Sequence, residues 1–237
     1  ISTASFLYFY ILRDLPNPKK LSTRKQILST KIYDRNQKLL YTVFDGNHNR
    51  SLVKLQEIPV HVINATISIE DKNFYHHPGF SPKAILRAAW NNSSQNGKLQ
   101  GGSTITQQLV KNAFLTPQRT LKRKIKELVL SIQVDLLYSK DQILEMYFNE
   151  VPFGGTAYGI EEAAQLYLAK SVKEVNLAEA ALLAGLPAAP SHFSPFGANP
   201  QLTAVRQRTV LNKMLGQGYI SQQEYQEAKK QKIKLAP

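Results

Sequence analysis

The 237-residue chain contains no cysteine. Disulfide bonds, catalytic thiols and cysteine-ligated zinc sites are therefore excluded. Nucleotide-binding glycine loops are missing as well. Gly101-Gly102-Ser103 is not followed by the Lys-Ser/Thr pair of a P-loop, and it does not fit the GxGxxG pattern of a dinucleotide-binding turn.

Acidic residues are scarce. The chain has 17 Asp and Glu against 30 Lys and Arg, which gives a formal net charge of +13. A charge of this size predicts an anionic partner such as nucleic acid, lipid headgroups or a phosphorylated substrate. The alternative is a basic protein without such a partner, but clustering of the basic residues favours the first interpretation. Hydrophobic residues make up 43%, enough for a globular core.

The N-terminal residues 1–12 carry no charge and are rich in aromatic side chains. Twelve residues are too few to span a bilayer, which takes ~20. We predict that residues 1–20 are the end of a transmembrane anchor and a linker, with Tyr8 and Tyr10 near the membrane interface. A buried amphipathic segment and the core of a signal peptide are the alternatives.

The remaining pattern predicts a mainly α-helical protein. Residues 21–56 form a region with a β-hairpin at 30–44, and residues 57–232 form a mainly helical domain. The expected helices begin at Pro59, at Ser81-Pro82 and at Asn199-Pro200, and two more cover 103–115 and 120–138. Three capping boxes, which begin at Ser139, Asn176 and Ser221, predict further helix starts.

Three stretches read as loops, namely 93–102, 152–159 and 187–200. The first of them is polar and glycine-rich, and we expect it to be mobile. On the helix expected at 120–138, the residues predicted to share a single apolar face are Leu121, Ile125, Leu128, Val129, Ile132 and Leu136.

Glu70 and Asp71 lie at the end of the helix that begins at Pro59. Glu70 continues the apolar stripe of Ile63 and Ile67, so its carboxylate should be partly desolvated, as suits a general base. Taken alone, an acidic pair at a helix end is more often solvated. His77, which precedes a proline, is more often structural than a ligand.

The segment 119–127 sets one acid among five basic residues. On a helix, Glu127 is four residues from Arg123 and three from Lys124, so ion pairs are expected. A solvated charged face is the ordinary interpretation. The functional one is a cationic platform for phosphate, to which Lys111 would add. Glu145, beside Ile143 and Leu144, is predicted to be a partly buried structural acid.

Five ordered motifs contain these residues. They are Glu70-Asp71-x-x-Phe74-x-x-His77-x-Gly79; Gly101-Gly102-Ser103-Thr104-Ile105-Thr106-Gln107-Gln108 with Lys111-Asn112; Arg123-Lys124-x-x-Glu127; Lys140-x-x-Ile143-Leu144-Glu145-x-Tyr147-x-Asn149; and Arg206-x-Arg208-x-Val210-Leu211-x-x-Met214. Together they resemble the peptidoglycan glycosyltransferases (glycosyltransferase family 51) of class A penicillin-binding proteins and monofunctional glycosyltransferases. The last motif is the loosest, because Gln207 stands where a second arginine often occurs.

The resemblance implies that residues 57–232 are the catalytic domain, with a lysozyme-like helical fold and a mobile lobe near the membrane. It implies inverting transfer of a glycan from a polyprenyl pyrophosphate donor to the 4-hydroxyl of lipid II. Glu70 would be the catalytic base and Glu127 would orient the pyrophosphate or hold a metal. The residues implied at the donor and pyrophosphate site are Ser103, Thr104, Gln108, Lys111, Asn112, Arg123 and Lys124. The supporting residues are Asp71, Phe74, His77, Glu145 and Arg206.

The same resemblance implies no obligatory cofactor, with Mg²⁺ or Mn²⁺ as an optional ion. The implied partners are lipid II, the nascent glycan chain and membrane lipids, together with a C-terminal transpeptidase domain or other cell-wall synthesis proteins. The implied location is the outer face of the bacterial cell membrane. Nucleic acid is not expected as a partner, since no basic-aromatic platform or helix-turn-helix pattern is present.

Two other functions stay open on the sequence alone. A lysozyme-like hydrolase or lytic transglycosylase also uses a glutamate on a helical scaffold, but it has no need of a basic helix. A non-catalytic module that binds a membrane surface would need only the positive charge and the anchor.

Overall fold

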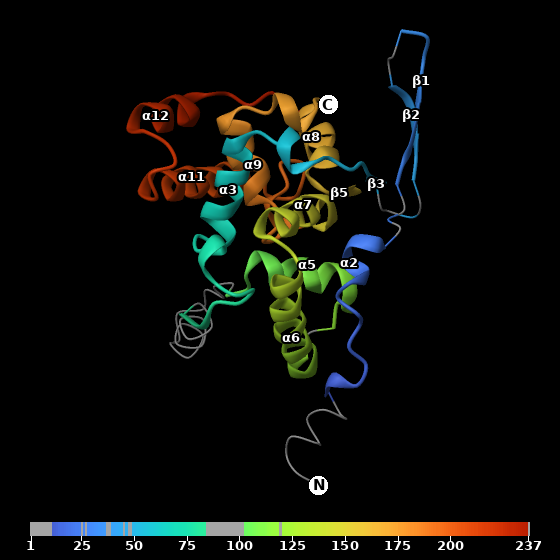
Figure 1. The fold of residues 1–237 in the computed structure, drawn as a ribbon. Helices are drawn as coiled ribbons and strands as arrows, with labels where there is room; N and C mark the ends of the chain where they lie inside the picture. Colours follow the sequence, from blue (N-terminus) through green and yellow to red (C-terminus); the bar gives the residue numbers. More distant parts are fainter. Residues whose placement is uncertain are drawn as a thin grey trace. The chain divides into compact units, whose positions relative to one another are not determined.

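The computed structural model describes residues 11–24, 26, 28–36, 39–44, 46, 49–83, 102–118 and 120–236. The chain divides into two compact units (Figure 1). The first unit comprises residues 1–24 and 73–147, and the second comprises residues 25–72 and 148–237. The predicted catalytic domain, residues 57–232, contains parts of both units, and its boundaries stay a prediction.

The first unit is helical. Its elements are α2 (Lys20–Thr23), the 3₁₀ turn η3 (Phe74–His76), α5 (Ile105–Phe114), α6 (Leu121–Leu137) and most of α7 (Lys140–Glu150). The side chain of Thr104 caps α5 and that of Thr120 caps α6, each by accepting a bond from a backbone N–H of the first turn. α5 and α6 pack against each other. The helices predicted at 103–115 and 120–138 are therefore confirmed, each within two residues.

The second unit joins a helical core to two small sheets. Its helical elements are η2 (Leu55–Glu57), α3 (Val60–Glu70), α8 (Ile160–Leu168), η4 (Val172–Glu174), α9 (Leu177–Gly185), α10 (Pro190–Phe193), α11 (Gln201–Gly216) and α12 (Gln222–Lys230). α3, α9 and α11 pack pairwise into the core, which contains Val62, Ile67, Leu183, Val210 and Met214 among its buried residues. Pro59 is the residue before α3, where its fixed φ of −56° leads into the helix. The predicted mainly α class is confirmed.

The predicted hairpin consists of the antiparallel strands β1 (Thr30–Tyr33) and β2 (Leu39–Val43).

The interpretation of residues 152–159 as a loop is wrong. β4 (Pro152–Gly154) pairs antiparallel with β5 (Ala157–Tyr158), and β5 also pairs in parallel with β3 (Asn49–Arg50). The partner strand β3 lies about a hundred residues earlier in the sequence, so no local pattern indicates the sheet.

The three predicted capping boxes are present. Ser139, Asn176 and Ser221 each exchange bonds with the residue three positions later, at 2.7–3.2 Å. α10 lies within the segment 187–200 that was expected to be a loop. Of the helix expected from Ser81-Pro82, the structure describes only Pro82 and Lys83, which are helical. The rest of that helix and residues 93–101 of the expected mobile loop lie outside the described residues.

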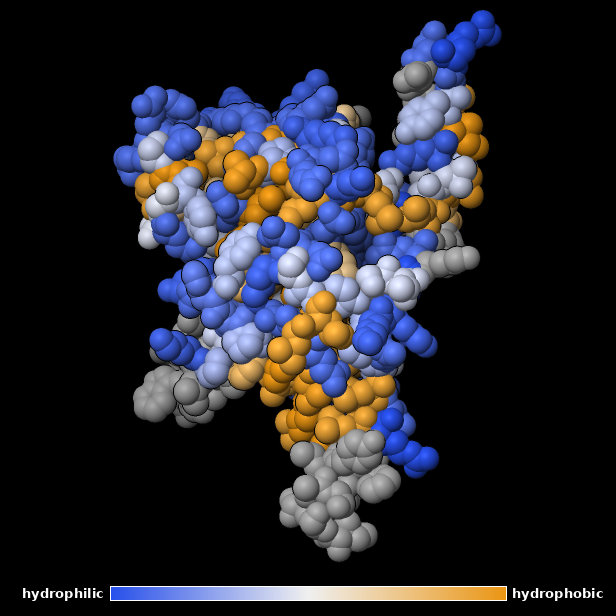
Figure 2. All heavy atoms as spheres, viewed as in Figure 1, coloured by the Kyte–Doolittle hydropathy of each residue, from blue (hydrophilic) through white to orange (hydrophobic). Residues whose placement is uncertain are grey.

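The apolar face predicted for α6 is wrong. Its buried residues are Glu127, Leu130, Ser131 and Val134, whereas the residues Leu121 and Leu136 are 78% and 79% exposed. The two sets lie on adjacent arcs of the same helix, and contact with α5 decides which arc is buried. The arc with Leu121 and Leu136 leaves apolar surface over α6 (Figure 2).

Among the described residues, no helix combines the length and the apolar character needed to cross a bilayer. Residues 1–10, with Tyr8 and Tyr10, lie outside the described part of the chain. The predicted anchor and the predicted mobile lobe therefore stay predictions.

Candidate active site

The residues singled out by the sequence fall into one group in each unit. In the first unit, Lys124 of α6 is the central residue. Its ammonium group donates to the hydroxyl of Ser103 at 2.8 Å and forms an ion pair with the carboxylate of Glu127. The Glu127 side chain is 2% exposed, while that of Lys124 is 43% exposed. A buried carboxylate and a hydroxyl thus hold a cation that still reaches solvent.

Ser103 and Thr104 lie at the N-terminus of α5, where the partial positive charge of the helix dipole is found. Thr104 and Gln107 form a capping box, in which Oε1 of Gln107 accepts from the Thr104 N–H at 3.0 Å. The fixed ammonium of Lys124 adds to the positive potential of this helix end. An arrangement of this kind suits an oxyanion such as phosphate.

Thr104 also connects the second motif to the first. Its hydroxyl donates to the carbonyl of Gly79 at 2.6 Å. Gly79 has φ +75°, and an added Cβ there would lie 2.3 Å from the carbonyl oxygen of Ser131 in α6. The glycine that ends the first motif is required by this close approach, because any other side chain would collide with α6.

Lys140, to which the sequence gave no role, holds the first motif in place. Its ammonium donates to the carbonyl of His77 at 2.6 Å and to the carboxylate of Asp135 at 2.5 Å. It also lies 5.0 Å from the centroid of the Phe74 ring. Phe74 and His77 are both buried, and the supporting role predicted for them stays a prediction. The place of Lys140 at the head of the fourth motif was the available signal.

The remaining residues of the first group are also placed. Gln108 accepts a bond from the Tyr147 hydroxyl at 3.4 Å. Lys111 and Asn112 are half-buried in the second half of α5, and Glu145 is half-buried on α7. Glu127 pairs with Lys124, and within the described part of the chain no bond reaches the buried Nε of Arg123, the other expected partner. Arg119 lies outside the described residues.

In the second unit, Glu70 is the last residue of α3 and its side chain is 8% exposed. The predicted partial burial is confirmed. Nη2 of Arg206, on α11, lies 3.4 Å from Oε1 of Glu70. Burial lowers the pKa of the Arg206 guanidinium below its ordinary value, and the charge of Glu70 acts in the opposite direction. Asp71 is buried just after the helix, and its N–H closes the last turn on Ile67.

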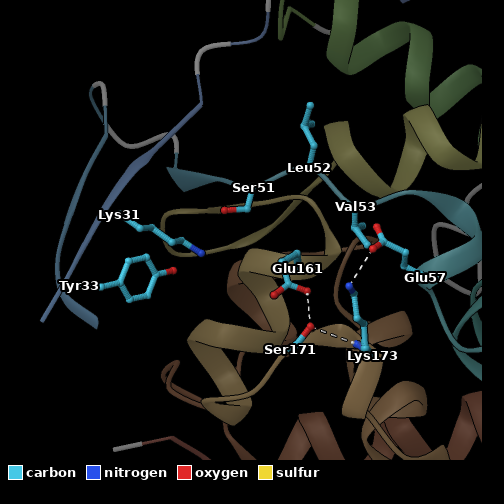
Figure 3. Close-up of a pocket in the computed structure, with 9 residues that line it drawn as sticks. All are labelled: Lys31, Tyr33, Ser51, Leu52, Val53, Glu57, Glu161, Ser171 and Lys173. Carbon is cyan, nitrogen blue, oxygen red and sulfur yellow. Dashed lines mark hydrogen bonds and ion pairs between the residues drawn. The ribbon is translucent and has the colours of Figure 1, made fainter. Parts of the chain in front are cut away.

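A pocket in the second unit lies apart from these residues (Figure 3). It lies where β1 faces the segment 51–53, and its wall includes Lys31, Glu161 and Lys173. Lys173 is paired with Glu57 at 2.7 Å, and Glu161 accepts from the Ser171 hydroxyl at 3.1 Å. None of the residues predicted to act in catalysis lines this pocket.

A metal site formed by the protein alone is not found among the described residues, where no three His, Cys, Asp or Glu side chains gather. Glu127, the predicted ligand, contributes one carboxylate that is already paired with Lys124. The described residues therefore do not form a set of metal ligands.

Comparison with known proteins assigns the family. The sequence profile of the transglycosylase family matches residues 36–215. The chain belongs to the transglycosylase family. The predicted family, and with it the enzyme class of peptidoglycan glycosyltransferase, is confirmed.

Relatives of this transglycosylase are long proteins. It is 46% identical to penicillin-binding protein 1A of Aquifex aeolicus over 218 residues, which are 92% of this chain and 30% of that protein. It is 41% identical to penicillin-binding protein 1A of Escherichia coli, over 96% of this chain and 26% of that protein. The chain thus spans less than a third of the length of these relatives.

A solved structure is similar as well. The crystal structure of penicillin-binding protein 1A from Haemophilus influenzae matches with a TM-score of 0.52 and 27% identity, over 90% of this chain and 21% of that one. This similarity supports the predicted lysozyme-like helical fold.

Proposed function

We propose that this chain polymerises lipid II into the glycan strands of peptidoglycan. The growing strand, linked to a polyprenyl pyrophosphate, is the donor, and lipid II is the acceptor. The observation that carries the proposal is the Lys124 ammonium, held by Ser103 and Glu127 at the N-terminus of α5. Pyrophosphate leaves as an anion, so fixed positive charge assists its departure more than a proton donor would.

Lys124 suits this task because its position is set before substrate binds. The hydroxyl of Ser103 and the carboxylate of Glu127 hold the ammonium group from two sides. Charge that is already oriented needs no reorganisation during the reaction. Arg123 and Lys111 add positive charge on α6 and α5, and Thr104, Gln108 and Asn112 shape the donor site around them.

We assign the role of base to Glu70. It takes the proton from the 4-hydroxyl of the acceptor sugar, whose oxygen attacks the anomeric carbon of the donor. The bond from that carbon to the pyrophosphate oxygen breaks, and the configuration inverts. Burial of the Glu70 side chain and its contact with Arg206 support this role, because both control the protonation and orientation of the carboxylate.

A divalent ion, Mg²⁺ or Mn²⁺, stays an optional part of the proposal. If one binds, Glu127 supplies one carboxylate oxygen and the ion adds positive charge beside the pyrophosphate. The residues that the structure describes do not make a complete ligand set, so no step of the reaction is derived through a metal.

We also propose that the chain works at the outer face of the cell membrane. The exposed Leu121, Leu136 and Leu137 of α6 offer apolar surface, and the net charge of +13 attracts anionic lipids. The length of the relatives supports a further domain in the whole protein, and we propose a transpeptidase. Other cell-wall synthesis proteins are proposed as partners.

The test is polymerisation of lipid II by a Glu70→Gln variant. Loss of a general base should lower the rate by about 10²–10⁴-fold. Activity within about threefold of the unmodified chain would remove Glu70 from this role. A parallel incubation with finished peptidoglycan and no lipid II separates the hydrolase alternative, because only a hydrolase or lytic enzyme would release muropeptides.

A further inference from the structure

Arg206 lies on α11, which packs against both α3 and α9. Its guanidinium group makes three contacts. Nη2 lies 3.4 Å from Oε1 of Glu70, Nε donates to the carbonyl of Gly185 at 3.2 Å, and Cζ lies 5.1 Å from the centroid of the Phe193 ring. The residue therefore joins the end of α3 to the end of α9 and to α10.

Two of these contacts fix the guanidinium without help from Glu70. Phe193 is held in turn, because its carbonyl accepts from the buried hydroxyl of Thr203 at 2.8 Å. Gly185 leaves room for the stem of Arg206, since a Cβ on Gly185 would lie 2.8 Å from Cγ of the arginine. The position of the charge is thus set by α9 and α10, and the carboxylate meets a cation that is already in place.

Glu70 needs such a cation. Its side chain is 8% exposed, and burial of a carboxylate favours its neutral form. Glu70 is also the last residue of α3, where the partial negative charge at the C-terminal end of the helix dipole disfavours an ionised carboxylate. A carboxylate that must accept a proton has to be ionised before it can do so. A fixed guanidinium offsets both effects.

We propose that Arg206 is a positioning residue for the base: it orients the Glu70 carboxylate and keeps it ionised, while Gly185 and Phe193 hold Arg206 in place. The proposal rests on the proposed role of Glu70. It gives Arg206, a residue of the fifth and loosest motif, a role in controlling Glu70, a residue of the first motif. Arg206 acts through Glu70, and the proposal includes no contact between Arg206 and the substrate.

Other charged groups lie on the helices that pack around this pair or next to Glu70 in the chain. Lys213 of α11 donates to the backbone carbonyl of Ile69 at 3.3 Å, and Asp71 and Lys72 follow Glu70 in the chain. On α9, Glu179 is paired with Lys170 at 2.8 Å. All of these groups remain in variants of Arg206, so a change in the pH dependence of such variants is due to the lost guanidinium.

The experiment measures lipid II polymerisation by Arg206→Gln over a series of pH values. Without the cation the carboxylate binds its proton more tightly, so the acid limb of the pH profile should move to higher pH. A shift of about one unit is expected, because a neighbouring opposite charge changes the proton affinity of a carboxyl group by ~1–3 units. The turnover number should fall by roughly tenfold or more, with a smaller change in KM. Arg206→Lys keeps the charge and should restore most of the acid limb.

Gln207→Ala is a matched control on the same helix. Gln207 donates to the carbonyl of Ala178 at 2.9 Å, so it also links α11 to α9, but it does so without a charge. A role of Arg206 in packing alone predicts the same outcome for the two positions. The positioning role predicts a normal pH profile for Gln207→Ala.

Gly185→Ala tests the proposal without removing any charge, should Arg206→Gln fail to fold. The new methyl group displaces the stem of Arg206, so the acid limb should again move to higher pH. Gly216→Ala is its control: Gly216 is also the last residue of its helix, and a Cβ there would meet nothing within 4 Å.

The outcomes separate the two proposals. If Glu70→Gln stays active, the assignment of the base fails, whatever Arg206 does. If Glu70→Gln is inactive while Arg206→Gln and Gly185→Ala keep the acid limb of the unmodified chain, the base stands and the positioning role is wrong. A shifted limb in both variants, with normal profiles for Gln207→Ala and Gly216→Ala, is the result that we expect.

Discussion

Substitution of Gly79 by alanine should destabilise the first unit through two separate effects. The residue has φ +75°, and an added Cβ would lie 2.3 Å from the carbonyl oxygen of Ser131. The left-handed conformation costs a residue with a side chain roughly 1–2 kcal/mol. Forcing α6 away from the new methyl group costs about 1–3 kcal/mol more, as in other overpacked interiors.

The expected loss is therefore about 3 kcal/mol. For a chain of this size, ~1 kcal/mol corresponds to about 2–4 °C in the melting temperature, so Gly79→Ala should melt roughly 6–12 °C lower. Thermal unfolding followed by circular dichroism measures the difference.

Gly218 provides the control. It has the same φ of +75°, but a Cβ there would meet nothing within 4 Å. Gly218→Ala therefore carries only the conformational cost, about 1–2 kcal/mol or ~2–8 °C. If Gly79→Ala melts no lower than Gly218→Ala, the close approach to α6 does not contribute and the explanation of this glycine is wrong.

Two further predictions concern substrate and membrane. Lys124→Ala should lower the turnover number of lipid II polymerisation by about 10²–10³-fold, because it removes the oriented positive charge that stabilises the leaving group. Lys173→Ala is the control: it removes an exposed cation paired with Glu57 and should leave lipid II polymerisation unchanged. Equal effects of the two substitutions would refute the role of Lys124. Leu136→Ser with Leu137→Ser should weaken binding to anionic vesicles, measured by sedimentation, by roughly thirtyfold, since each exposed leucine loses ~1 kcal/mol of burial in the lipid. Val205→Ser, at an exposed apolar position on α11, is the control, and unchanged vesicle binding by the α6 variant would contradict the proposed contact.

Much of the fold could be predicted because its signals are local. The capping boxes at Ser139, Asn176 and Ser221 involve residues three positions apart, and the hairpin at 30–44 joins strands that follow each other directly. Among the site residues, the pairing of Lys124 with Glu127 lies within one turn of α6. The helical periodicity that predicts α6 fixes that spacing before any tertiary contact forms.

The sequence by itself determined most of the longer helices, three of their capping boxes, the excess of positive charge and the ordered motifs that assign the family. Tertiary structure decided the contacts between distant residues, because they depend on which surfaces meet. Contact with α5 decided that the arc of α6 with Glu127 is buried and that Leu121 and Leu136 are exposed. Packing of α11 brought Arg206 to Glu70, 136 residues earlier in the chain. The close approach of α6 explains why the first motif ends in glycine, since the collision with Ser131 exists only in the folded chain.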